Sequence, residues 1–163
     1  MKILIFTEGT ILMHKNGCNL PREEIVRQVV NKEISVSNYT SYIPIGNALE
    51  KIKKWKEGGA TVLYLTSRTK QREIEAIKNV LKRHDFPEGE LFYRKANETY
   101  ANVAERVMPS ILIEDDCESI GGEVEMTCPH MKDGVKMMTK SVIVKEFSGI
   151  DNLPDNLSNL SEA

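Results

Sequence analysis

The stretch Ile3-Leu4-Ile5-Phe6-Thr7-Glu8-Gly9-Thr10 is an apolar run that ends in a polar turn. An uninterrupted apolar run of this length is typical of a strand buried on both faces of a sheet. We therefore expect a strand over residues 2–6, with Thr7 and Glu8 at its carboxyl end.

Similar apolar runs alternate with amphipathic helical patterns along the rest of the chain. Further strands are expected at 61–65, 91–93, 111–113 and 141–144, and helices near 21–31, 48–55, 74–84 and 100–107. Parallel neighbours need crossovers of a dozen or more residues, and these helices supply them. The sequence thus predicts an α/β fold, a three-layer Rossmann-like parallel sheet with helices on both faces.

Composition narrows the class of protein. The chain has 163 residues, 40% of them hydrophobic, and a formal net charge of −2. This charge gives no general reason to bind nucleic acid or an anionic membrane, which favours small molecules or protein partners. Three widely spaced cysteines, no apolar run of about 20 residues and no leader-like start predict a reduced, cytoplasmic protein.

Polar residues follow each of four expected strands. They are Thr7-Glu8, Thr66-Ser67-Arg68, Arg94-Lys95 and Glu114-Asp115-Asp116. Ligands of parallel α/β sheets gather beyond the carboxyl ends of the strands, so these groups are expected to share one site. Paired carboxylates suit a hard cation such as Mg²⁺, while hydroxyl, amide and cationic groups suit a phosphate.

The order of these motifs resembles that of the haloacid dehalogenase-like (HAD) hydrolases. Their first strand is followed by Asp, any residue, Asp, Gly and Thr, and Gly9-Thr10 aligns with the last two. The resemblance implies that Asp115, Asp116 and Glu8 hold a metal. It implies phosphate-binding roles for Gly9, Thr10, Thr66, Ser67 and Lys95, with Arg94 as a rival for the role of Lys95.

Position 6 departs from that pattern. Phe6 stands where the resemblance implies a nucleophilic Asp, and Glu8 stands in the place of the acid. A phenyl ring can neither attack phosphorus nor ligate a metal, so the covalent aspartyl-phosphate step is excluded. Two classes stay open: a phosphate- or metal-binding protein without turnover, and a metal-dependent phosphohydrolase that uses Glu8 with a metal-bound water. A purely structural subunit is a third reading. The expected ligand is a phosphorylated small molecule or a protein partner.

Two segments flank the expected core of this single domain. Residues 11–47 are too many for a direct crossover, and we expect a flap or minimal cap there, with His14 exposed. Residues 151–163 form a polar tail with Leu153, Leu157 and Leu160 as anchors.

The loop over residues 117–138 is rich in Cys and Met. Cys117, Cys128 and His130 are an alternative, softer metal set, but their spacing is unlike that of zinc sites. Reduced thiols that fill small apolar space are the simpler reading. The loop's methionines, which include Met126, Met131, Met137 and Met138, are expected to pack it.

Overall fold

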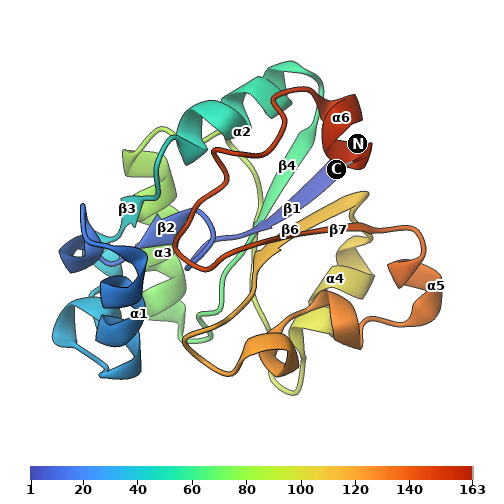
Figure 1. Ribbon diagram of the computed structural model, residues 1–163. Helices are drawn as coiled ribbons and strands as arrows, with labels where there is room; N and C mark the ends of the chain where they lie inside the picture. The colour runs from blue at the N-terminus through green and yellow to red at the C-terminus, as the bar shows by residue number, and fades with distance from the viewer. Residues whose placement is uncertain (163) are drawn as a thin grey trace.

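The computed structural model describes residues 1–162 and is built on a five-stranded parallel sheet (Figure 1). The strands are β1 (Lys2–Phe6), β4 (Thr61–Leu65), β5 (Leu91–Phe92), β6 (Ile111–Asp115) and β7 (Lys140–Val144). Their order across the sheet is β5-β4-β1-β6-β7, and every neighbouring pair is parallel. All five carboxyl ends therefore meet at one edge, as the sequence predicts.

Helices cover both faces of this sheet. They are α1 (Arg22–Val30), α2 (Ala48–Glu57), α3 (Gln71–Arg83), α4 (Tyr100–Val107), α5 (Asp133–Lys136) and α6 (Leu157–Glu162). Successive side chains of a strand point to opposite faces. In β1, Ile3 and Ile5 belong to a core with residues of α2 and α3, and Leu4 and Phe6 to a core with residues of α4. The predicted fold class, a three-layer Rossmann-like α/β sheet, is confirmed.

Residues 11–47 form a small layer beside the carboxyl edge of the sheet. The segment contains α1, an antiparallel pair of β2 (Leu12–Met13) with β3 (Ile43–Pro44), and three short 3₁₀ helices. Those short helices are η1 (Lys15–Gly17), η2 (Ile34–Ser37) and η3 (Tyr39–Ser41). The last of them contacts α3, which ties the segment to the body of the fold.

The prediction that His14 is exposed is wrong, because its side chain is buried. Its Nε2 lies 2.6 Å from Oε1 of Gln28, which is also buried, and its ring packs edge-on against Phe147. This polar contact joins the residue that follows β2 to α1. An amphipathic imidazole can enter a core when such a partner is present, and a single sequence does not reveal the partner.

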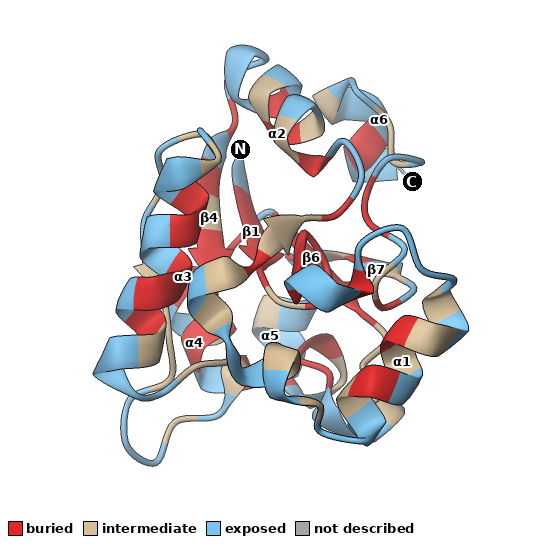
Figure 2. Cartoon of the chain, turned by 90° about the vertical axis from the view of Figure 1, so that its left-hand side faces the viewer, coloured by how far each residue is buried: buried red, intermediate tan, exposed pale blue. Residues whose placement is uncertain are grey.

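Burial along the chain is drawn in Figure 2, and it corrects the expectation for the methionine-rich loop. Met126 and Met131 are buried as predicted, whereas Met137 and Met138 are 87% and 63% exposed. Both exposed methionines directly follow the short helix α5, which ends at Lys136.

The tail packs against the body through its leucines and its backbone. Leu160 is fully buried, and the indole N–H of Trp55 donates to the carbonyl of Pro154 at 2.9 Å. No helix among residues 1–162 has the length and apolar character needed to cross a membrane.

Candidate functional site

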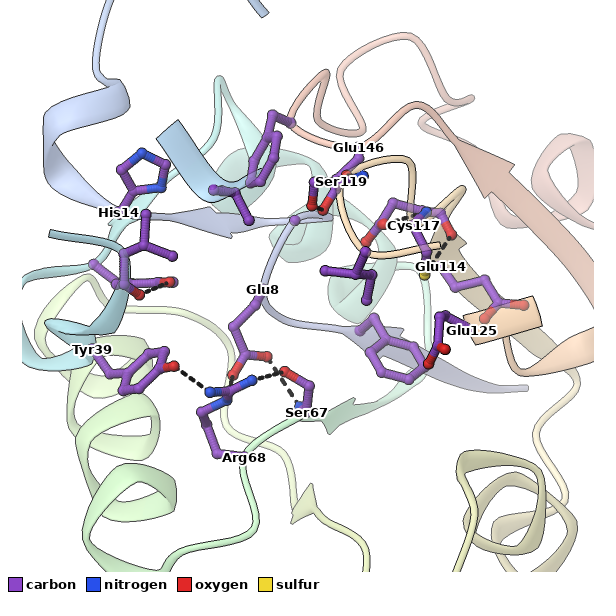
Figure 3. Close-up of a pocket in the computed structure, with 18 of the residues that line it drawn as sticks. Glu8, His14, Tyr39, Ser67, Arg68, Glu114, Cys117, Ser119, Glu125 and Glu146 are labelled. Carbon is purple, nitrogen blue, oxygen red and sulfur yellow. Dashed lines mark hydrogen bonds and ion pairs between the residues drawn. The ribbon is translucent and has the colours of Figure 1, made fainter. Parts of the chain in front are cut away.

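A cavity of about 140 Å³ lies between the carboxyl edge of the sheet and residues 11–47 (Figure 3). Its wall draws on the ends of β1, β4, β6 and β7, as the strand-end pattern predicts. Aromatic and carboxylate side chains dominate this lining. They include Phe6, Tyr39, Tyr42, Tyr100, Phe147, Glu8, Glu114, Asp115, Glu125 and Glu146.

Phe6 occupies the end of β1 and packs into the apolar core on the α4 side of the sheet. Its ring meets that of Tyr100 edge to face, with 5.1 Å between centroids. It pairs in register with Leu65, directly before Thr66. Phe6, which stands where the resemblance implies a nucleophile, therefore presents hydrocarbon to the cavity.

Three carboxylates meet at the ends of β6 and β7, where Asp115 and Glu146 line the cavity and Asp116 does not. Asp115, Asp116 and Glu146 each offer an oxygen, and the three oxygens lie within 4.8 Å of one another. Among residues 1–162 no side chain forms an ion pair with any of the three. Hard carboxylate oxygens at this spacing fit the ligand preference of Mg²⁺ or Ca²⁺.

Two of the carboxylates are held by hydrogen bonds, most of them from residues distant in sequence. Asp115 accepts from the hydroxyl of Thr10 at 2.8 Å and from the backbone N–H of Cys117 at 2.9 Å. Glu146 accepts from the backbone N–H of Ser119 at 2.7 Å and from its hydroxyl at 2.6 Å. Each carboxylate oxygen has two lone pairs, so these bonds orient the group and leave it able to ligate a cation.

Burial is the largest influence on the pKa values of Asp115 and Glu146. It raises the pKa of Asp115 and of Glu146, and the hydrogen bonds to each group offset only part of that effect. The negative charge of nearby carboxylates raises both pKa values further. A bound cation would relieve both penalties.

Gly9 and Thr10, for which the resemblance implies phosphate-binding roles, lie against Asp115. Gly9 has φ +82°, and a Cβ at that position would stand 2.8 Å from Oδ2 of Asp115. Only glycine lets the backbone pass so close to the carboxylate in this conformation. The structure thus places Thr10 as a donor to Asp115.

Glu8 lies apart from the three carboxylates and faces the end of β4. Its Oε1 accepts from the hydroxyl of Thr66 at 2.6 Å, and its Oε2 from the backbone N–H of Ser67 at 3.2 Å. The Nε of Arg68 lies 3.6 Å from Oε1. The structure brings Glu8 together with Thr66 and Ser67. Among the described residues, the carboxylates that converge are Asp115, Asp116 and Glu146, which we call the acidic group, and Glu8 is not one of them.

The two basic candidates point elsewhere. The guanidinium of Arg94 stacks on the ring of Tyr100, 4.2 Å from its centroid. Lys95 is exposed, and its backbone N–H donates to Glu98. Neither residue lines the cavity, so the described structure brings neither of them to the carboxylates.

The softer metal set is not assembled either. Cys128 is buried in the α4-side core, whereas the imidazole of His130 is exposed and contacts the carbonyl of Val124. Within residues 1–162, the group of metal-ligating side chains that comes together consists of carboxylates alone.

Glu114 explains how the loop after β6 is fixed. Its carboxylate is buried and accepts from the backbone N–H groups of Thr127, at 2.7 Å, and Cys128, at 2.9 Å. Burial raises its pKa, and these two bonds lower it in part. The first acid of the triplet therefore anchors residues 127–128, while the next two join Glu146.

Sequence reasoning missed Glu146 and its partner Ser119. Glu146 follows the last strand by two residues, so the rule that polar groups gather after strands would have found it if applied to 141–144. Ser119 lies in a loop with no periodic pattern, and no sequence signal marks it.

No protein-family model and no curated protein sequence matches this chain. Solved structures that resemble it include the Pnkp1/Rnl/Hen1 RNA repair complex, at 13% identity and a TM-score of 0.49. That match covers 88% of this chain and 43% of the other, so the chain spans less than half of that relative.

Two further structures are similar over most of their length. A D,D-heptose 1,7-bisphosphate phosphatase from Burkholderia thailandensis has 10% identity and a TM-score of 0.46, with 90% of this chain and 93% of that chain covered. A HAD family hydrolase from Deinococcus radiodurans R1, with bound phosphate and sodium, has 8% identity and a TM-score of 0.46. That match covers 87% of this chain and 78% of the other chain. At such identities no residue's role is transferred to this chain.

Proposed function

We propose that this chain is a HAD-like binding protein that holds a divalent cation at the carboxyl edge of its sheet and does not form an aspartyl-phosphate. The observation that carries this proposal is the pairing of Phe6 at the end of β1 with three converging carboxylates nearby. Asp115, Asp116 and Glu146 offer oxygens within 4.8 Å of one another. The chemistry of these donors suits Mg²⁺, the cofactor that the motif order implies.

The alternative is a phosphohydrolase in which Glu8 activates a water bound to the cation. The geometry favours this reading less, because both oxygens of Glu8 accept hydrogen bonds at the end of β4. A general base must reach the water from which it takes a proton. Glu8 is not one of the described carboxylates that would hold the cation, and its own carboxylate faces the end of β4.

Cation binding is tested by thermal unfolding and titration calorimetry with MgCl₂, MnCl₂ and CaCl₂. We expect stabilisation of wild type that saturates, about 2.7 kcal/mol when the cation is at 100 times its Kd. D115N, D116N and E146Q should lose the effect. Glu125 also lines the cavity but lies outside the acidic group, so E125Q is the matched control and should keep it.

Two results would overturn the proposal. One is the absence of any cation effect on wild type. The other is an equal effect on wild type and on all three acidic-group variants. A panel of phosphate esters with the same cations separates the alternative, since turnover that E8Q abolishes would establish the phosphohydrolase. The predicted ligand is a phosphorylated small molecule or a protein partner. The phosphate esters of the same panel test the first of these.

A further inference from the structure

The carboxylate of Glu8 sits in a set of donors suited to an oxyanion. The hydroxyl of Thr66 and the backbone N–H of Ser67 donate to its two oxygens, and the guanidinium of Arg68 lies beside it. The hydroxyl of Thr7 donates to it as well. Hydroxyl, amide and guanidinium groups around one carboxylate are the groups that bind carboxylate and phosphate ligands in proteins. Figure 3 shows Glu8, Ser67 and Arg68 on one side of the cavity.

These donors are fixed by contacts other than Glu8. Thr66 is fully buried at the end of β4, and its Oγ1 also accepts from the backbone N–H of Arg68 at 3.2 Å. The guanidinium of Arg68 stacks 4.5 Å from the ring centroid of Tyr39, and its Nη2 donates to Oγ of Ser67 at 3.0 Å. The donor set would therefore persist if the Glu8 carboxylate moved away.

The hydroxyl groups of Thr7 and Thr66 differ in whether they have an acceptor other than Glu8. Thr7 has a second acceptor, because its hydroxyl also donates to the carbonyl of Leu65 at 3.2 Å. The buried hydroxyl of Thr66 donates to Glu8. Loss of the carboxylate would leave this donor and the N–H of Ser67 without an acceptor, which is costly in a buried position. An oxyanion that enters from the cavity would restore those bonds.

We propose that Glu8 is an internal occupant of the donor set formed by Thr66, Ser67 and Arg68, and that an oxyanion ligand must displace it in order to bind there. The inference rests on the phosphorylated ligand named under the proposed function and adds a condition for its binding. It does not depend on a cation at the three carboxylates. Wild type then binds oxyanions weakly, since the apparent affinity is reduced by the fraction of molecules in which the site is open.

The test uses E8A, which removes the occupant and leaves the donors in place. Binding of phosphate and of acetate is measured in EDTA by thermal unfolding and isothermal titration, with chloride at matched ionic strength as the baseline. We expect E8A to bind phosphate about tenfold to a hundredfold more tightly than wild type, because it no longer competes with an internal carboxylate. The acetate arm shows whether a carboxylate ligand is accepted as well as a phosphate.

Two further variants make the result specific. E125A removes a carboxylate from the same cavity but outside the donor set, so it should bind as wild type does. E8A/T66V removes the central donor and should lose the gain. If E8A does not fold, E8S carries the same comparison, because a serine side chain is too short to fill the donor set.

The inference is overturned by any of three results. The first is that E8A, or E8S in its place, binds oxyanions no better than E125A. The second is that wild type binds them as tightly as E8A, and the third is that E8A/T66V keeps the gain. Each leaves the divalent-cation test untouched, because that test uses wild type and the Asp115, Asp116 and Glu146 variants without added phosphate.

Discussion

The hydroxyl of Thr10 donates a 2.8 Å hydrogen bond to Oδ2 of Asp115, and the two residues are 105 positions apart in the chain. Both side chains are buried. The bond joins the turn after β1 to the end of β6, so it fixes one carboxylate of the acidic group relative to the strand that bears Phe6.

Replacement of Thr10 tests this link. T10V keeps the shape and removes the donor, and it should lower the free energy of unfolding by about 1–3 kcal/mol because a buried carboxylate loses a partner. T10S keeps the hydroxyl and should cost about 1 kcal/mol for one buried methyl group. Urea unfolding of both variants measures the difference, and equal losses would mean that the hydrogen bond contributes nothing.

Alanine substitutions at Gly9 and Gly59 distinguish the effect of backbone conformation from the effect of a close contact. Gly9 and Gly59 both have positive φ, at +82° and +94°, but a Cβ on Gly59 meets no heavy atom within 4 Å. G59A should therefore cost about 1 kcal/mol through conformation alone. G9A also drives a methyl group against Asp115 and should cost about 1–2 kcal/mol more. Chemical denaturation of the two variants checks this order, and the reverse order would contradict the contact.

Phe6 should behave as a core residue. F6A removes a ring that packs against Tyr100 and should destabilise the fold by about 3 kcal/mol, while F6L should cost less than about 1.5 kcal/mol. Calorimetric binding of Mg²⁺ to F6L should match wild type, since the ring is no ligand. A large loss of cation affinity in F6L would show that position 6 shapes the acidic group directly.

The raised pKa of Asp115 predicts in which direction the free energy of unfolding changes with pH. Its folded pKa lies above the unfolded value of about 4, so the folded state holds the proton more tightly. The stability from this group is present below the unfolded pKa and is lost as pH rises through the folded pKa. The free-energy cost of D115N should therefore shrink as pH rises from about 4 toward neutrality. Unfolding curves in EDTA across that range measure it, and a cost that grows with pH would refute the sign.

The fold was accessible from sequence because its signals are local. Each strand is a short apolar run, and each helix repeats its apolar residues with a helical period, so the order of elements and the shared sheet edge follow. The site was accessible only in part. Strand-end positions marked Glu8, Thr66 and Asp115, but where a carboxylate points depends on contacts between distant segments.

Glu8 and Arg94 illustrate that gap. The sequence puts Glu8 near Asp115 and Thr66 alike, and only the fold shows that its oxygens accept from Thr66 and Ser67. Arg94 follows β5 as expected of a phosphate-binding cation, yet its guanidinium stacks on Tyr100. Such choices among partners rest on side-chain geometry, which spacing along the chain does not encode.

Arg22, the first residue of α1, donates from its Nε to the carbonyl of Glu146 at 2.7 Å and pairs with Glu118. The start of α1 is thus fastened to the backbone of a residue in the acidic group. Outward rotation of α1 must either break this bond or carry Glu146 with it. The position of α1 and the position of one carboxylate of the acidic group are therefore mechanically linked through the backbone of Glu146.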